Sequence, residues 1–240
     1  MQEEKRKHCG LQAQELVSRQ QSKEEKLKMI SKLTTPQDLL SPSLSFARAI
    51  NTDSKLEYIQ VRPSANALAN ECYSNVENVI KERGGKRILG WQIWEWPGFF
   101  AEAEAHAIWQ SQEYELYDVS PKAEHKIAFI ADPNLKITGN RIDNLRHALA
   151  DIEVVHDFIK TGKLKHGIFG SIISGTKLDT WQVVIGGRLD KATWLLPHLF
   201  KAEGNINQRC PCSSGLSYAA CHRSEVRRTL EMATNAVFEQ

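Results

Sequence analysis

The sequence lacks any long apolar run. No segment of its 240 residues approaches the roughly 18 consecutive apolar residues that a membrane-spanning helix requires. The first residues, MQEEKRKHCG, are charged and contain no apolar stretch like that of a secretory leader. An excess of charge is also lacking, because 31 basic side chains face 29 acidic ones and the net charge is +2. These absences predict a cytoplasmic protein with no membrane partner, and they disfavour a nucleic-acid partner.

Cysteine is scarce but unevenly spread. The chain has five cysteines, and three of them fall in the segment CPCSSGLSYAACH, residues 210–222. In a reducing compartment, clustered thiols bind metal more often than they form disulfides. Three cysteines and an adjacent histidine suit tetrahedral Zn²⁺, and such a set is typical of a closed structural site. The predicted ligands of one structural zinc ion per chain are Cys210, Cys212, Cys221 and His222.

This segment resembles the SEC-C motif, a zinc knuckle at the C-terminus of the SecA translocase motor and in many small bacterial proteins. The shared pattern is Cys-Pro-Cys, then Ser-Gly, an aromatic residue, and a last Cys followed by Cys or His. Ala219 and Ala220 stand where the family usually has lysines. The resemblance implies a protein partner, such as the chaperone SecB or a ribosome. Nearby arginines can supply positive charge: Arg209, Arg223, Arg227 and Arg228.

Composition divides the chain into five parts. The first part is rich in Lys, Glu and Gln, and the second carries two prolines among small polar residues. The third has the mixed helix and strand patterns of a core domain. We predict a charged helical arm at 1–33, a linker at 34–54, a main domain at 55–200, the knuckle at 205–225, and a C-terminal helix or tail at 226–240.

The main domain is predicted to be α+β, with helices packed on an antiparallel sheet. LEYIQVRPS is strand-like, and NECYSNVENVIKERGG has helical spacing, a possible N-cap at Asn70 and a stop at Gly84-Gly85. Four strand-like runs follow, which predicts an antiparallel meander. A later helix is predicted over residues 140–162, and a further hairpin within 163–189.

One cysteine of the main domain is a candidate nucleophile. Cys72 lies near the start of the predicted helix, His106 lies in the strand-like AEAEAHAIW, and Asp118 follows in YELYDVSP. This order resembles the transglutaminase-like and wider papain-like superfamily. The resemblance implies a related fold and a cysteine-dependent hydrolase or acyl transferase that acts on a protein or peptide amide. In it, Cys72 would be the nucleophile, His106 the base, and Asp118 the residue that orients His106.

The physical chemistry of such a site is consistent. A helix N-terminus and a nearby imidazolium stabilise a thiolate, which is the reactive form of cysteine. An oxyanion hole would need the backbone N–H of Cys72 and a second donor, for which Gln60 and Asn70 are candidates. Other readings stay open, because buried cysteine is a common small hydrophobe and Asp118 can serve a turn. The chain would then be a non-catalytic zinc-binding adaptor for a protein partner.

Overall fold

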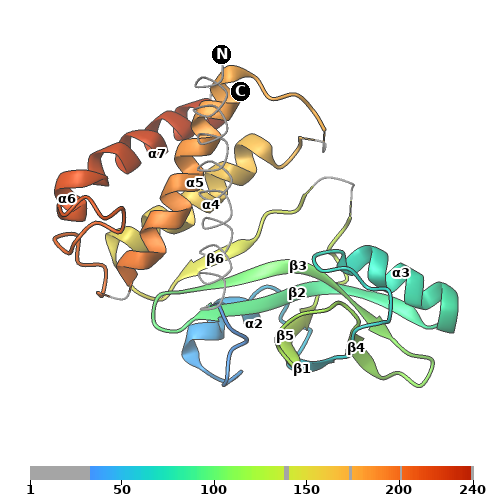
Figure 1. The fold of residues 1–240 in the computed structure, drawn as a ribbon. Coiled ribbons are helices and arrows are strands. Elements are labelled where there is room, and N and C mark those ends of the chain that lie inside the picture. Colours follow the sequence, from blue (N-terminus) through green and yellow to red (C-terminus); the bar gives the residue numbers. More distant parts are fainter. Residues whose placement is uncertain (1–32, 138–140, 173–174, 201, 239–240) are drawn as a thin grey trace, which may run out of the picture. The chain divides into compact units, whose positions relative to one another are not determined.

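The structure is a computed structural model that describes residues 33–137, 141–172, 175–200 and 202–238. The predicted arm at 1–33 therefore lies almost wholly outside the described residues. Thr34–Gln240 form one compact unit that combines a sheet with several helices (Figure 1). The predicted α+β class is confirmed. None of the described helices is long and apolar enough to cross a membrane.

The sheet closes on itself. Its strand order is β2-β5-β1-β4-β3-β6, and β2 also pairs with β3. Strands β1 to β5 therefore form a ring, and β6 is added outside it on β3. Closure leaves these five strands without a free edge. The strands are β1 (Leu56–Val61), β2 (Lys86–Trp96), β3 (Phe100–Gln110), β4 (Leu116–Asp118), β5 (Lys126–Ala131) and β6 (Leu145–Ala148).

The predicted meander is correct for β2, β3 and β4 but wrong for β5. Strands β2 and β3 form a long hairpin that turns at Gly98, whose φ of +80° favours glycine. Strand β5 does not pair with β4; it pairs antiparallel with β1 and β2. Strand β4 pairs parallel with β1 instead. A parallel pair needs a long crossover, and helix α3 lies within the segment that provides it.

Helix α3 (Cys72–Arg83) packs on the ring through an apolar face. Val76 and Val79 are buried in a cluster with Ala107 and Trp109 of β3. The helix ends as predicted at Gly84, which has a φ of +72° and donates its N–H to Ile80. The predicted N-cap is wrong. Glu71 holds that position without a side-chain cap, and Asn70, one residue earlier, has a φ of +65°.

Residues 34–54, the predicted linker, pack on the sheet. They contain a 3-10 turn, η1 (Pro42–Leu44), and a short helix, α2 (Ser45–Arg48). Leu44 and Ala47 are completely buried against the sheet. Pro42 is compatible with this packing, because it stands at the start of η1, a position that tolerates proline.

The C-terminal half is helical where a hairpin was predicted. Residues 145–148 form β6, so the helix predicted from 140 begins only at 153, and it runs past 162. An ideal Cβ on Gly162 would lie 2.9 Å from the Arg146 guanidinium, so this glycine makes room for a side chain and does not stop the helix. The helices are α4 (Glu153–Phe169), α5 (Thr180–Phe200), α6 (Tyr218–Cys221) and α7 (Arg223–Phe238).

Helices α4, α5 and α7 lie together as a bundle beside the sheet (Figure 1). Rings from the bundle and the sheet meet: Phe200 packs edge-on against Trp96 at 5.0 Å, and Phe158 contacts Phe100 at 5.1 Å. Helix α7 buries Val226, Leu230 and Ala233. The C-terminal segment therefore shares the core of the bundle.

Candidate functional site

Cys72 is the first residue of α3 and lies on the wall of a large cleft. The cleft has a volume of about 1260 Å³ and is bounded by the start of α3, by β3, and by helices α4 and α5. The Cys72 side chain is largely covered, with 9% of the residue exposed. Its helix has no side-chain cap, so the N–H groups of the first turn stay available at the cleft.

His106 and Asp118 form a buried pair next to Cys72. Their strands β3 and β4 are neighbours in the sheet. The His106 Nε2 atom lies 3.1 Å from Asp118 Oδ2, and the two residues are 5% and 0% exposed. Cys72 is close enough to His106 to raise the pKa of the ring. With Nε2 facing the carboxylate, Nδ1 is the ring nitrogen left for the thiol.

The pKa values of His106 and Asp118 are shifted in opposite directions. Burial lowers the pKa of His106, but hydrogen bonds with Asp118 and Cys72 and the charge of Asp118 outweigh burial and raise it to about 9. Burial raises the pKa of Asp118, but its hydrogen bond with His106 and the charges of His106 and Lys122 lower it to about 2. At neutral pH the pair is therefore an imidazolium and a carboxylate.

Asp118 has two further partners that hold it in place. Its Oδ1 atom accepts a hydrogen bond from the Ser120 N–H at 2.9 Å. Its Oδ2 atom lies 2.6 Å from the Lys122 ammonium. The sequence analysis missed Lys122, because one lysine in a polar loop after a strand resembles any surface lysine.

The structure thus brings Cys72, His106 and Asp118 together. That they act in catalysis stays a prediction. Of the two candidate oxyanion donors, Asn70 lines the cleft beside Cys72. Gln60 is an exposed residue of β1 that is paired in the ladder with Tyr117.

The rest of the cleft combines apolar side chains, such as Phe158 and Phe169, with charged side chains that form ion pairs. Arg146 of β6 reaches Glu102 of β3 at 2.7 Å and Asp143 at 2.9 Å. Lys165 of α4 lies 2.6 Å from Asp190 of α5. Burial raises the pKa of Glu102, although the charge of Arg146 opposes it. Walls that mix apolar and charged side chains are typical of ligand-binding clefts.

The predicted zinc ligands converge at the other end of the bundle. His222 Nδ1 lies 3.1 Å from Cys210 Sγ and 3.2 Å from Cys221 Sγ, and the sulfurs of Cys212 and Cys221 are 3.6 Å apart. All four ligand atoms lie within 4.8 Å of one another. Ligands of one tetrahedral zinc ion are about 3.6–3.8 Å apart for the usual bond lengths. This donor set can hold a metal ion and fits zinc.

Local backbone geometry shapes the metal site. Ser213 and Gly215 have φ values of +64° and +80°, which turn the chain tightly between Cys212 and the short helix α6. The Cys210 N–H donates to Leu216 O at 2.8 Å, which closes this turn. The Ser214 hydroxyl lies 3.2 Å from Cys221 Sγ, where it can donate to a thiolate.

Glu225 and Lys191 hold the His222 ring in position. Its Nε2 atom lies 3.6 Å from the Glu225 carboxylate, which in turn is 3.0 Å from the Lys191 ammonium of α5. A carboxylate on Nε2 favours the tautomer that presents Nδ1 to a metal. The metal site is therefore connected to the helix bundle.

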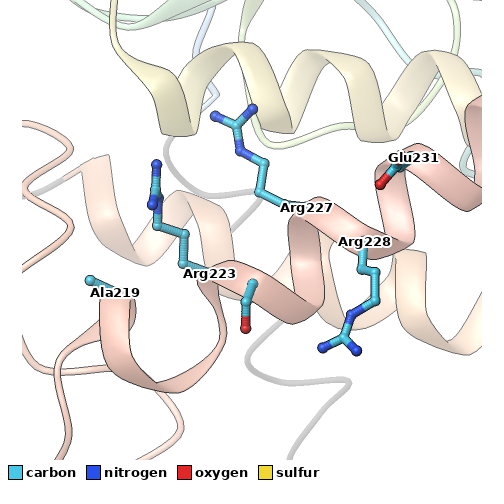
Figure 2. Close-up of a pocket in the computed structure, with 6 residues that line it drawn as sticks. Ala219, Arg223, Arg227, Arg228 and Glu231 are labelled. Atoms are coloured by element: carbon cyan, nitrogen blue, oxygen red, sulfur yellow. The ribbon is translucent and has the colours of Figure 1, made fainter.

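The knuckle is also joined to α4 by ion pairs. Arg223 donates to both carboxylate oxygens of Glu153, at 2.7 and 2.9 Å. Arg227 lies 3.2 Å from Glu153 and from Asp157. Figure 2 shows Arg223 and Arg227 directed toward the neighbouring helix, with Arg228 directed away.

Comparison with known proteins supports the knuckle alone. The family model of the SEC-C motif matches residues 207–224, which contain all four predicted ligands. No curated protein and no solved structure matches the chain. The resemblance of the knuckle to the SEC-C motif is thus confirmed, and the chain carries a SEC-C segment with a Cys₃His group able to bind a metal.

Proposed function

We propose that the chain is a cysteine-dependent hydrolase or acyl transferase that acts on a protein or peptide amide. The observation that carries the proposal is the buried His106–Asp118 hydrogen bond next to Cys72 at a helix start on a cleft. A cysteine that only fills space in a core has no need of an oriented imidazole beside it. Here the histidine is fixed by a carboxylate, as a base or acid of catalysis must be.

Each residue has a role in the reaction. The Cys72 thiolate attacks the carbonyl carbon of the amide, and the electron pair of the C=O bond moves to oxygen. When the C–N bond breaks, the His106 imidazolium gives its proton to the leaving amine. The acyl group is then a thioester on Cys72. Water or an acceptor amine attacks it, His106 takes the proton, and the thiolate leaves.

The start of α3 can stabilise the thiolate and the oxyanion of the proposed reaction. The uncapped N–H groups of its first turn, including that of Cys72, can donate to the oxyanion. The positive end of the helix also favours the thiolate. Asn70, which lines the cleft beside Cys72, is the second donor that we favour. The mixed apolar and charged walls of the cleft can accommodate both the backbone and the side chains of a peptide.

Labelling of thiols tests the proposal. Iodoacetamide at pH 6 should alkylate Cys72 roughly tenfold faster than it alkylates N-acetylcysteine, because a thiolate–imidazolium pair keeps the reactive form. Peptide mass spectrometry locates the label. His106→Gln should reduce the labelling rate of Cys72 to that of N-acetylcysteine. His125→Gln, at an exposed loop position, should leave the rate unchanged. Equal rates for Cys72 and the free thiol in the native protein would reject the catalytic role.

A second candidate function is that of a non-catalytic zinc-binding adaptor. The observation that favours it is the outer surface of the knuckle and of α7. Leu216 of the knuckle is 53% exposed, and Arg228 of α7 points away from α4 (Figure 2). These side chains are free to meet a protein partner, such as the chaperone or ribosome that the SEC-C resemblance implies. Two results together would favour this function. Cys72 would be labelled slowly, and the protein would bind a partner that the variants Leu216→Ser and Arg228→Glu no longer bind.

A further inference from the structure

Two cationic side chains share one oxygen of Asp118. His106 Nε2 lies 3.1 Å and Lys122 Nζ lies 2.6 Å from Oδ2. The ammonium and the imidazole nitrogen are therefore within about 6 Å of each other, a distance at which like charges interact strongly away from water. Asp118 is completely buried, and the Lys122 side chain is only 14% exposed.

The position of Lys122 is fixed from a second side. Its ammonium donates a hydrogen bond to Gln92 Oε1 of β2 at 2.7 Å. Gln92 is 1% exposed, and its amide nitrogen has no hydrogen-bond partner among the described residues. The Trp94 ring lies beneath the ammonium at 5.9 Å. Lys122 is thus held between β2 and the end of β4, unlike a surface lysine.

Three residues have the largest effects on the charge state of His106. They are Cys72 from α3, Asp118 from β4 and Lys122 from the loop that follows it. Asp118 favours the protonated ring, and Lys122 opposes it. A histidine that gives up its proton in one step and takes it back in the next must not be held too firmly in either form.

We propose that Lys122 is a positioning residue of this site, whose charge fixes Asp118 as a carboxylate and weakens its hold on the His106 proton. The role rests on the proposed function, in which His106 alternates between acid and base. Without the ammonium, the Asp118 Oδ2 atom would interact with His106 and no longer with Lys122. The ring would then keep its proton to higher pH, and deacylation would slow because a protonated ring cannot accept a proton from water.

The titration of His106 measures this directly. The Cε1–H resonance of His106, assigned with His106→Gln, is followed against pH in ¹³C-histidine-labelled protein. Lys122→Met should move its midpoint upward by about 1 pH unit, the order expected for loss of a like charge at this distance. Lys122→Arg keeps the charge and should titrate like the native protein. Lys55→Met, at an exposed position before β1, is the matched control.

The outcomes separate this inference from the proposed function. An unchanged midpoint in Lys122→Met, or equal shifts in Lys122→Met and Lys122→Arg, would overturn the role of the charge. An upward shift in Lys122→Met alone supports it, whatever the reactivity of Cys72. Slow iodoacetamide labelling of the native protein would instead reject catalysis while leaving the effect of Lys122 on His106 established.

Discussion

The Glu153 carboxylate accepts hydrogen bonds from Nε and Nη2 of Arg223, at 2.7 and 2.9 Å. These bonds join the start of α4 to the first residue of α7. Paired donors of this kind fix direction as well as distance. Helix α4 carries one wall of the cleft that Cys72 lines, and α7 follows the metal site directly. The knuckle and the cleft are therefore parts of one packed structure.

Shortening the side chains that α7 buries should weaken the whole compact unit. Leu230 is 2% exposed in the bundle, so Leu230→Ala should lower the free energy of unfolding by about 2–4 kcal/mol. Met232→Ala, at a residue 41% exposed on the same helix, should change it by less than about 0.5 kcal/mol. Urea unfolding followed by circular dichroism gives both values. Equal effects of the two substitutions would show that α7 is not part of the core.

Metal analysis tests the knuckle. Freshly purified protein should contain one zinc ion per chain, and Cys210→Ser combined with Cys212→Ser should remove it. Since α7 follows His222 directly, we expect loss of the metal to lower the unfolding temperature of the bundle as well as to loosen residues 205–225. Protein without zinc, or full retention of zinc in the double variant, would contradict this assignment.

The Glu153–Arg223 pair should make stability depend on acid. The hydrogen bond that Glu153 accepts from Arg223 lowers the pKa of Glu153 to about 2. Partial burial opposes this shift, and Arg227 adds to it. The stabilisation is then complete above the ordinary value of 4.5 and is lost as the pH falls through about 2. We expect about 1 kcal/mol or less, because the pair is partly exposed to solvent. Glu153→Gln should reduce the difference in urea midpoint between pH 6 and pH 3.

The His106–Asp118 pair should make the stability depend on pH with the opposite sign. The pKa of His106 is raised from 6.5 to about 9, so its contribution is complete below pH 6.5 and is lost as the pH rises through about 9. Asp118→Asn leaves a buried partner unpaired and should cost about 3 kcal/mol at pH 6. Chemical unfolding at pH 6 and pH 9.5 should show that the variant loses less stability than the native protein over this interval.

Two glycines of the cleft should respond oppositely to the same substitution. Glycine inside a helix is usually about 1 kcal/mol less stable than alanine, and nothing lies within 4 Å of an ideal Cβ on Gly187. Gly187→Ala should therefore stabilise the protein. At Gly162 the added methyl would meet the Arg146 guanidinium, which Glu102 and Asp143 hold, so Gly162→Ala should destabilise by about 1–3 kcal/mol. Thermal unfolding of the two variants measures both effects, and stabilisation by Gly162→Ala would contradict the role of Gly162 in making room for Arg146.

The Cys₃His group and the apolar face of α3 were predictable, because both depend on spacing within one short segment. Gly84 likewise marked the end of α3 by its local conformation. Gly162 misled the prediction, since its reason is a contact with Arg146, which lies in another element. The pairing of β5 with β1, and the position of Lys122 between Asp118 and Gln92, also depend on residues far apart in the chain. Periodicity carries no information on such contacts.

Closure of the ring has a consequence for synthesis of the chain. Leu56 of β1 pairs with Ile130 of β5, so β1 leaves the ribosome long before its partner strand exists. At a typical elongation rate of about 5–20 residues per second, the delay is about 4–14 s. During that interval the apolar side chains of Leu56 and Ile59, buried in the finished protein, remain uncovered by β5. Folding of this protein therefore waits on translation, and slowing translation through residues 62–131 would lengthen the period in which β1 is prone to aggregate.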